Sequence, residues 1–130
     1  MVVYVLPKHG TRVRFPLPAL MLKPSDFVKI QISVPATHAD EVRAAVGRAG
    51  AGKQGTYEYC SSSYKTVGRF LPMPGAEPAI GTIGAMEETD EEIIETICHK
   101  DVVPVVIAAV KRVHPYEEPA IDILPRFEIE

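Results

Sequence analysis

Residues 114–118, HPYEE, gather side chains that could do chemistry: an imidazole, a phenol and two adjacent carboxylates. An imidazole with one or two carboxylates can hold a divalent ion weakly, but a stable site needs about four ligands. The missing ligands would have to come from elsewhere in the chain or from another subunit. In the alternative, structural interpretation, Pro115 ends a helix and Tyr116 buries its ring while its hydroxyl finds a partner. The residues alone favour this structural turn.

A glycine-rich segment, GRAGAGKQG, offers a second kind of chemistry. Gly47, Gly52 and Lys53 have the spacing of a phosphate-binding loop, G-x-x-x-x-G-K. Gln54 stands where that loop needs Ser or Thr, and the segment follows an expected helix instead of a strand. A glycine cap and a tight turn are therefore expected. A weaker option is an anion site, in which Lys53 acts with backbone amides around Gly52 and Gly55.

The composition limits the function classes. A chain of 130 residues with 46% hydrophobic and 24% charged residues is expected to form one globular domain. Its net charge of −3 argues against nucleic-acid binding, which needs a basic face. No apolar run approaches the roughly 20 residues of a membrane span, and the start does not look like a secretory signal. Two cysteines are too few for a disulfide framework, so we expect a cytoplasmic protein.

The pattern of apolar residues predicts the elements that must position these groups. The expected elements are a strand at 2–6, a strand at 28–34, a helix from a Thr37/Asp40 capping box to Gly50, two strands TYEYCSSS and KTVGRFL paired as a hairpin, a helix from Asp101 to Pro115 and a strand at 120–124. Proline is frequent in residues 1–27, which we interpret as an N-terminal extension to a domain at 28–130. Met21 could also be the true start.

The segment ETDEEIIETIC carries two conflicting signals. Thr89 and Glu92 have the spacing of a capping box, which favours a helix. Ile93, Glu95 and Ile97 alternate, which favours a strand. Local signals leave both states open. The element order is therefore β-α-β-β-(β or α)-α-β, which is typical of ferredoxin-like α+β folds.

Three stretches together resemble a known family: VPATHADEVRAAVGRAGAGKQGTYEYC, GRFLPMPGAEPAIG and HPYEEPAID. They are similar to the PII/CutA-like inserted domain of the YqfO (Nif-three-like) family over roughly residues 28–124. The resemblance implies a ferredoxin-like sandwich of one antiparallel sheet and two helices that forms a trimer through its sheets. It also implies a strand for ETDEEIIETIC. We expect the runs TYEYC and IETIC to lie at sheet edges, where pairing between subunits would cover them.

These observations predict a non-enzymatic homotrimer that binds a divalent metal or a small anionic ligand, with regulation of a protein partner as a further expectation. The expected metal ligands are His114 and Glu118. The expected ligand-binding residues are Gly52, Lys53, Gly55 and Tyr116. One alternative is a small metal-dependent hydrolase, although no nucleophile-base-orienter set is visible in the sequence. Another is an assembly module that docks on a separate chain, since full-length members of that family carry a dinuclear metal site in a larger α/β domain.

Overall fold

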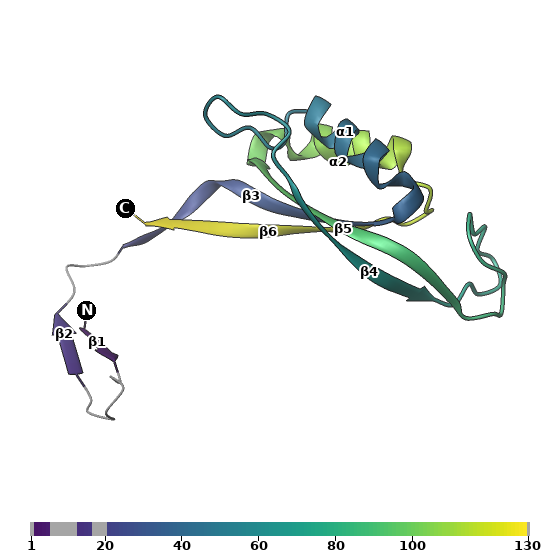
Figure 1. The fold of residues 1–130 in the computed structure, drawn as a ribbon, viewed down its shortest axis with the longest axis horizontal. Coiled ribbons are helices and arrows are strands. Elements are labelled where there is room, and N and C mark those ends of the chain that lie inside the picture. Colours follow the sequence, from purple (N-terminus) through teal and green to yellow (C-terminus); the bar gives the residue numbers. More distant parts are fainter. Residues whose placement is uncertain (1, 6–12, 17–20, 130) are drawn as a thin grey trace.

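The protein is described by a computed structural model covering residues 2–5, 13–16 and 21–129, with side chains for 21–129. Its main body is one antiparallel sheet of four strands, in the order β4-β5-β3-β6, with two helices (Figure 1). The strands are β3 (Leu22–Pro35), β4 (Ser62–Phe70), β5 (Glu87–His99) and β6 (Ala120–Ile129), and the helices are α1 (Ala39–Arg48) and α2 (Val103–Val113). This is the predicted ferredoxin-like α+β fold.

Two short strands precede this body. β1 (Val2–Val5) and β2 (Val13–Pro16) pair with each other in an antiparallel two-stranded sheet. β1 confirms the strand expected at 2–6 except for Leu6, which lies outside the described residues.

Both helices cover the same face of the four-stranded sheet, and the other face is open (Figure 1). Along β3, the alternation predicted from the sequence places Ile30, Ile32 and Val34 on the covered face, where all three are completely buried. The helices bury their own apolar stripes against them. The core so formed comprises Ile30, Ile32, Val34, Ala39, Val42, Val46, Ala51, Ile94, Cys98, Val106 and Val110.

The predicted helix caps are wrong. A short 3-10 turn precedes each helix, Ala36–His38 before α1 and Lys100–Val102 before α2. Backbone bonds of these turns satisfy the first amides, so neither helix has a side-chain cap. The hydroxyl of Thr37 instead lies 2.9 Å from Nδ1 of His38.

The predicted hairpin of TYEYCSSS with KTVGRFL is also wrong. Residues 56–60 form no strand, and β4 starts at Ser62 and pairs with β5. β5 confirms the strand reading of ETDEEIIETIC, because pairing on both sides and burial of Ile94, Thr96 and Cys98 outweigh a local capping signal. IETIC is therefore central in the sheet, and the edges are formed by β4 and β6.

β3 starts earlier than the strand expected at 28–34. Leu22, Lys23 and Pro24 pair with the end of β6, across a register shift that precedes Val28. Residues 22–27 of the predicted extension are thus part of a strand, and the two paired strands extend beyond the helices (Figure 1). No helix in the described parts of the chain is long and apolar enough to cross a membrane.

Candidate ligand site

The HPYEE segment joins the end of α2 to β6, and His114 holds it to the sheet. Nε2 of His114 lies 2.7 Å from the backbone oxygen of Ser33, and Nδ1 accepts the backbone N–H of Tyr116 at 3.1 Å. Because Nδ1 is an acceptor, Nε2 must carry the proton, and it donates a hydrogen bond to the backbone oxygen of Ser33. Burial lowers the pKa of His114 below its ordinary value of 6.5, against the opposite effects of the Ser33 carbonyl and of Glu91. The imidazole is therefore neutral and fully bonded.

This turn directs Tyr116 toward the start of β5. The hydroxyl of Tyr116 donates a hydrogen bond to Oε2 of Glu91 at 2.8 Å. Burial, followed by this hydrogen bond, raises the pKa of Tyr116 well above its ordinary value of 10, so the phenol keeps its proton. Its ring also meets that of Phe70 edge to face, with centroids 5.6 Å apart. Residues from β4, β5 and the α2–β6 connection thus meet at one place.

Glu91 is a buried carboxylate in this group, with only 8% of its surface exposed. Gly68, on the neighbouring strand β4, makes room for it, because a Cβ atom at Gly68 would overlap the Glu91 carboxylate. Glycine inside a strand often marks such a close approach. The backbone of Gly68 does not have a positive φ, so its role here is space.

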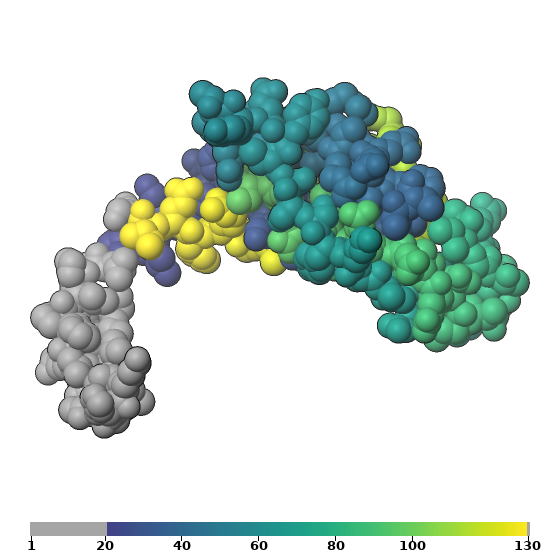
Figure 2. Space-filling model, viewed as in Figure 1, coloured from purple at the N-terminus to yellow at the C-terminus, as the bar shows by residue number. Residues whose placement is uncertain are grey.

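Glu91 and Tyr116 line a cavity of about 630 Å³ beneath the loop 71–86, which connects β4 to β5. The lining residues are Ser33, Gly68, Arg69, Phe70, Leu71, Pro72, Gly75, Ala76, Pro78, Ala79, Ile80, Glu91, Tyr116, Glu117, Glu118 and Ala120. In Figure 2 the loop is the green mass that projects beyond the helices at one end of the molecule. The volume is in the range of small-molecule sites.

The charges around this cavity are mostly negative. Glu91, Glu117 and Glu118 line it, against one guanidinium, that of Arg69. Arg69 is engaged with Glu88 at 3.0 Å, and Glu117 accepts the backbone N–H of Glu77 from the overlying loop. The HPYEE segment therefore helps to close the cavity and contributes to its negative charge.

The predicted metal ligands, His114 and Glu118, lie in the same connection, where Glu118 lines the cavity and His114 is hydrogen-bonded. Both ring nitrogens of His114 already bond to backbone groups, so neither has a lone pair directed at an ion. Among residues 21–129, no three His, Cys, Asp or Glu side chains are grouped as metal ligands. A metal at His114 and Glu118 would therefore need further donors, beyond those that residues 21–129 of one subunit group there.

The glycine-rich segment forms a turn in which two backbone amides already have partners. The amide of Gly52 donates to the carbonyl of Ile97 at 2.8 Å, and the amide of Gln54 donates to the carbonyl of Tyr57 at 2.9 Å. Lys53 lies 3.9 Å from Glu58 and is well exposed. These amides stabilise a turn, as expected from the interpretation of the glycines as a cap and a tight turn. Gly52 also borders a hollow of about 210 Å³.

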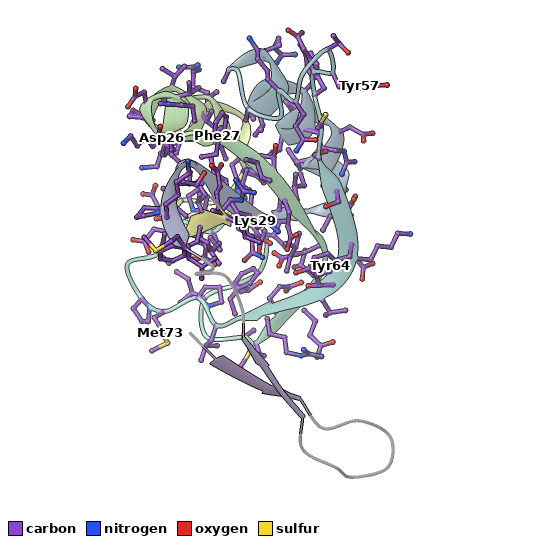
Figure 3. The ribbon with its side chains drawn as sticks, turned by 90° about the vertical axis from the view of Figure 1, so that its left-hand side faces the viewer. Asp26, Phe27, Lys29, Tyr57, Tyr64 and Met73 are labelled. Carbon is purple, nitrogen blue, oxygen red and sulfur yellow. The ribbon has the colours of Figure 1, made fainter. Side chains whose placement is uncertain are left out.

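The four residues predicted to bind ligand do not lie at one place. The loop that holds Gly52, Lys53 and Gly55 precedes β4, whereas Tyr116 lies at the cavity where β4 ends. A strand of nine residues spans roughly 30 Å. Figures 1 and 3 show the two loops at opposite ends of β4; Tyr57 and Met73, one in each loop, are both exposed.

The sequence signals missed Glu91, Phe70 and Gly68. Glu91 belongs to a run of acidic residues between 87 and 95, and such runs usually form a solvated face. The usable signal was its place in the alternation of β5: neighbours in a strand point to opposite faces, so the carboxylates of the run could not all be equivalent. Gly68 inside the strand run KTVGRFL was a second signal, because such a glycine indicates a close neighbour.

Comparison with known proteins gives relatives for most of the chain. Over 97 residues, 75% of this chain, it is 48% identical to a protein of Halalkalibacterium halodurans named GTP cyclohydrolase 1 type 2 homolog. It is 44% identical over 97 residues to the Bacillus subtilis protein of the same name. In both cases the match covers 26% of the relative, so the chain spans about a quarter of the curated relatives' length. No protein-family model matches the chain.

Solved structures that resemble this chain include a NIF3-related protein and proteins of the CutA and GlnK type. The Bacillus cereus protein related to NIF3 superposes with a TM-score of 0.69 at 38% identity, over 84% of this chain and 27% of that one. CutA from Archaeoglobus fulgidus, named a periplasmic divalent cation tolerance protein, gives a TM-score of 0.56 at 18% identity, over 77% of this chain and 83% of that one. GlnK of Bacillus subtilis gives 0.52 at 16% identity, over 77% and 84%. The last two likenesses concern the fold alone.

Proposed function

We propose that this chain, which carries the PII/CutA-like domain of the YqfO (Nif-three-like) family, is a non-enzymatic homotrimeric module that binds a small ligand in the cavity beside HPYEE. One observation carries the proposal: the buried carboxylate of Glu91 and the half-buried phenol of Tyr116 converge on a cavity of about 630 Å³. Apolar walls with a few converging polar groups are the usual form of a small-molecule site. One structural neighbour, GlnK, has been solved as a complex with ATP.

The direct test is a screen of small metabolites by thermal shift, with a cavity-filling variant as the control. Ala79 is exposed and lines the cavity, so a large side chain there is expected to fill it without disturbing the core. Ala79→Trp should keep the melting temperature of the free protein within a few degrees and abolish the shift caused by true ligands. Equal shifts in both proteins would place the ligand elsewhere, and a panel without any hit would contradict the proposal.

Trimer formation is supported by surfaces that one subunit leaves uncovered. β4 and β6 each pair on one side only within the described sheet. The open face of the sheet carries two large apolar side chains, Tyr64 (50% exposed) and Leu124 (37% exposed). Tyr64 pairs with Ile93 and Leu124 pairs with Lys29, and paired residues point to the same face, which here is the face without helices. Free strand edges and apolar side chains of this kind are usually covered by another chain.

We therefore expect light scattering at micromolar concentration to return three times 14.2 kDa. Tyr64→Lys should weaken the assembly, since it puts a charge on the open face without changing the covered core. The matched control is Tyr57→Lys, which puts the same charge on the exposed loop that precedes β4, outside the sheet. A monomeric wild-type protein at that concentration would contradict the trimer.

Two alternatives remain distinct from this proposal. A small metal-dependent hydrolase would agree with the name of the relatives, but the chain spans a quarter of their length and its described residues group no three metal donors. An assembly module that docks on a separate chain would need no ligand in the cavity. Co-purification of such a chain, together with a screen that finds no ligand, would favour the assembly module.

A further inference from the structure

We propose that the ligand of this cavity is a small organic cation, with an ammonium or amidinium group on an apolar body. The inference rests on the proposed function, because it names the ligand class of the same cavity. It follows from the environment of Glu91, from the charges around the opening and from the nature of the walls.

Glu91 has too few partners for a buried carboxylate. Only 8% of its surface is exposed, and its one hydrogen-bond donor within the described residues is the hydroxyl of Tyr116, on Oε2. None of the ion pairs found in residues 21–129 involves Glu91. A buried charge is costly unless it is paired and hydrogen-bonded. A cationic donor entering the cavity would supply the missing partner.

The other charges at the cavity favour a cation as well. Glu117 and Glu118 add two carboxylates to the lining, while the single guanidinium, on Arg69, is already paired with Glu88. An anionic ligand would meet three carboxylates and one cation that is already paired. Electrostatic complementarity of this kind selects the sign of a ligand's charge.

The walls indicate an organic ligand in preference to a bare metal ion. The apolar lining comprises Phe70, Leu71, Pro72, Pro78 and Ile80. These side chains offer no donors to a metal, and about 630 Å³ far exceeds the volume of an ion. The rings of Phe70 and Tyr116 present aromatic surface next to the carboxylate, and such surface attracts ammonium and guanidinium groups.

The inference is tested with three probes that share one apolar body and carry a positive, a neutral or a negative head group. Benzylamine, benzyl alcohol and benzoate differ in the head group and share the phenyl ring. Titrated against ¹⁵N-labelled full-length protein at constant ionic strength, benzylamine should bind at least about tenfold tighter than the alcohol, as expected for a hydrogen bond to a charged partner. Shifted amides should include Gly68, Phe70 and Tyr116. Benzoate should not bind.

Substitution of the carboxylate identifies its role. Glu91→Gln keeps the size and an acceptor for Tyr116 but removes the charge, so benzylamine binding should fall about tenfold or more while benzyl alcohol binding is unchanged. Glu58→Gln is the matched control, since Glu58 is an exposed carboxylate on the loop at the other end of β4. It should leave both affinities unaltered.

The failures of the two proposals are distinguishable. If neutral or anionic compounds bind in the cavity and Ala79→Trp abolishes their binding, the ligand is no cation, while the proposed binding function stands. Zinc chloride is the metal arm: amide shifts with zinc that Glu91→Gln removes, without any binding of benzylamine, would overturn the organic cation. Cavity binding of benzylamine that Glu91→Gln leaves intact would overturn the role of the carboxylate.

Discussion

Replacing Gly52 by alanine should lower the free energy of unfolding by about 3 kcal/mol, the largest effect we expect from any single methyl group in this protein. Gly52 has a φ of +78°, where L-residues are disfavoured by about 1–2 kcal/mol. A Cβ atom there would lie 2.5 Å from the backbone oxygen and 2.7 Å from the backbone nitrogen of Cys60. Backbone atoms cannot rotate away as a side chain can, so overpacking adds to the strain.

The close approach is imposed by hydrogen bonds on both sides of Gly52. Its amide donates to Ile97 in β5 at 2.8 Å, and its carbonyl accepts the amide of Cys60 at 2.9 Å. Any shift that relieved the alanine would therefore break the attachment of the loop 51–61 to the sheet.

Gly55→Ala is the matched control for this prediction. Gly55 also has a positive φ, +57°, but a Cβ atom there would have no heavy atom within 4 Å. This variant should lose only about 1 kcal/mol of unfolding free energy, from backbone strain alone. Urea unfolding of both variants measures the difference. Equal losses at the two positions would show that the contact with Cys60 relaxes freely.

His114→Ala should lower the free energy of unfolding by about 2–4 kcal/mol. The imidazole is 7% exposed, bonds through both nitrogens and packs against the ring of Tyr116 with centroids 5.2 Å apart. Alanine would leave a void and remove the partners of the Ser33 carbonyl and the Tyr116 amide. His38→Ala is the control: His38 is half-buried and, among the described residues, its ring bonds only to the hydroxyl of Thr37. This variant should lose less than about 1 kcal/mol of unfolding free energy.

The stability of the protein should depend on pH through the same residue, His114. Because burial lowers the folded-state pKa of His114 below 6.5, the unfolded chain takes up a proton at a higher pH than the folded protein. The stability associated with neutral His114 is therefore complete above pH 6.5 and is lost as the pH falls below that value. Unfolding midpoints should decline from pH 7.5 toward 5.5 in the wild type, and the decline should be smaller in His114→Ala. Parallel declines would exclude His114 as the source.

Calorimetry with zinc separates the structural role of His114 from the predicted metal role. If wild-type protein binds zinc, a folded His114→Ala variant of unchanged stability that has lost this binding would make His114 a ligand, against its observed hydrogen bonds. Reduced stability with unchanged zinc affinity would confirm that the imidazole fixes the turn.

The sequence by itself determined the elements whose patterns are local. The alternation of Val28, Ile30, Ile32 and Val34 follows from one face of a strand lying against the core, and the structure shows that strand. The apolar stripe of residues 103–113 likewise predicted α2, and the likeness of three stretches, HPYEEPAID among them, to a known family indicated the fold. These features depend on residues close to one another in the chain.

Only the tertiary structure decided which residues form the site. ETDEEIIETIC became a strand because β3 and β4 pair with it on both sides, a stabilisation larger than any capping preference. The same pairing placed Gly68 beside Glu91, and the turn held by His114 brought Tyr116 to that carboxylate from 25 positions away. Conversely, the nine residues of β4 separate the Gly52 loop from the cavity. Contacts between distant residues depend on strand register, which local patterns do not specify.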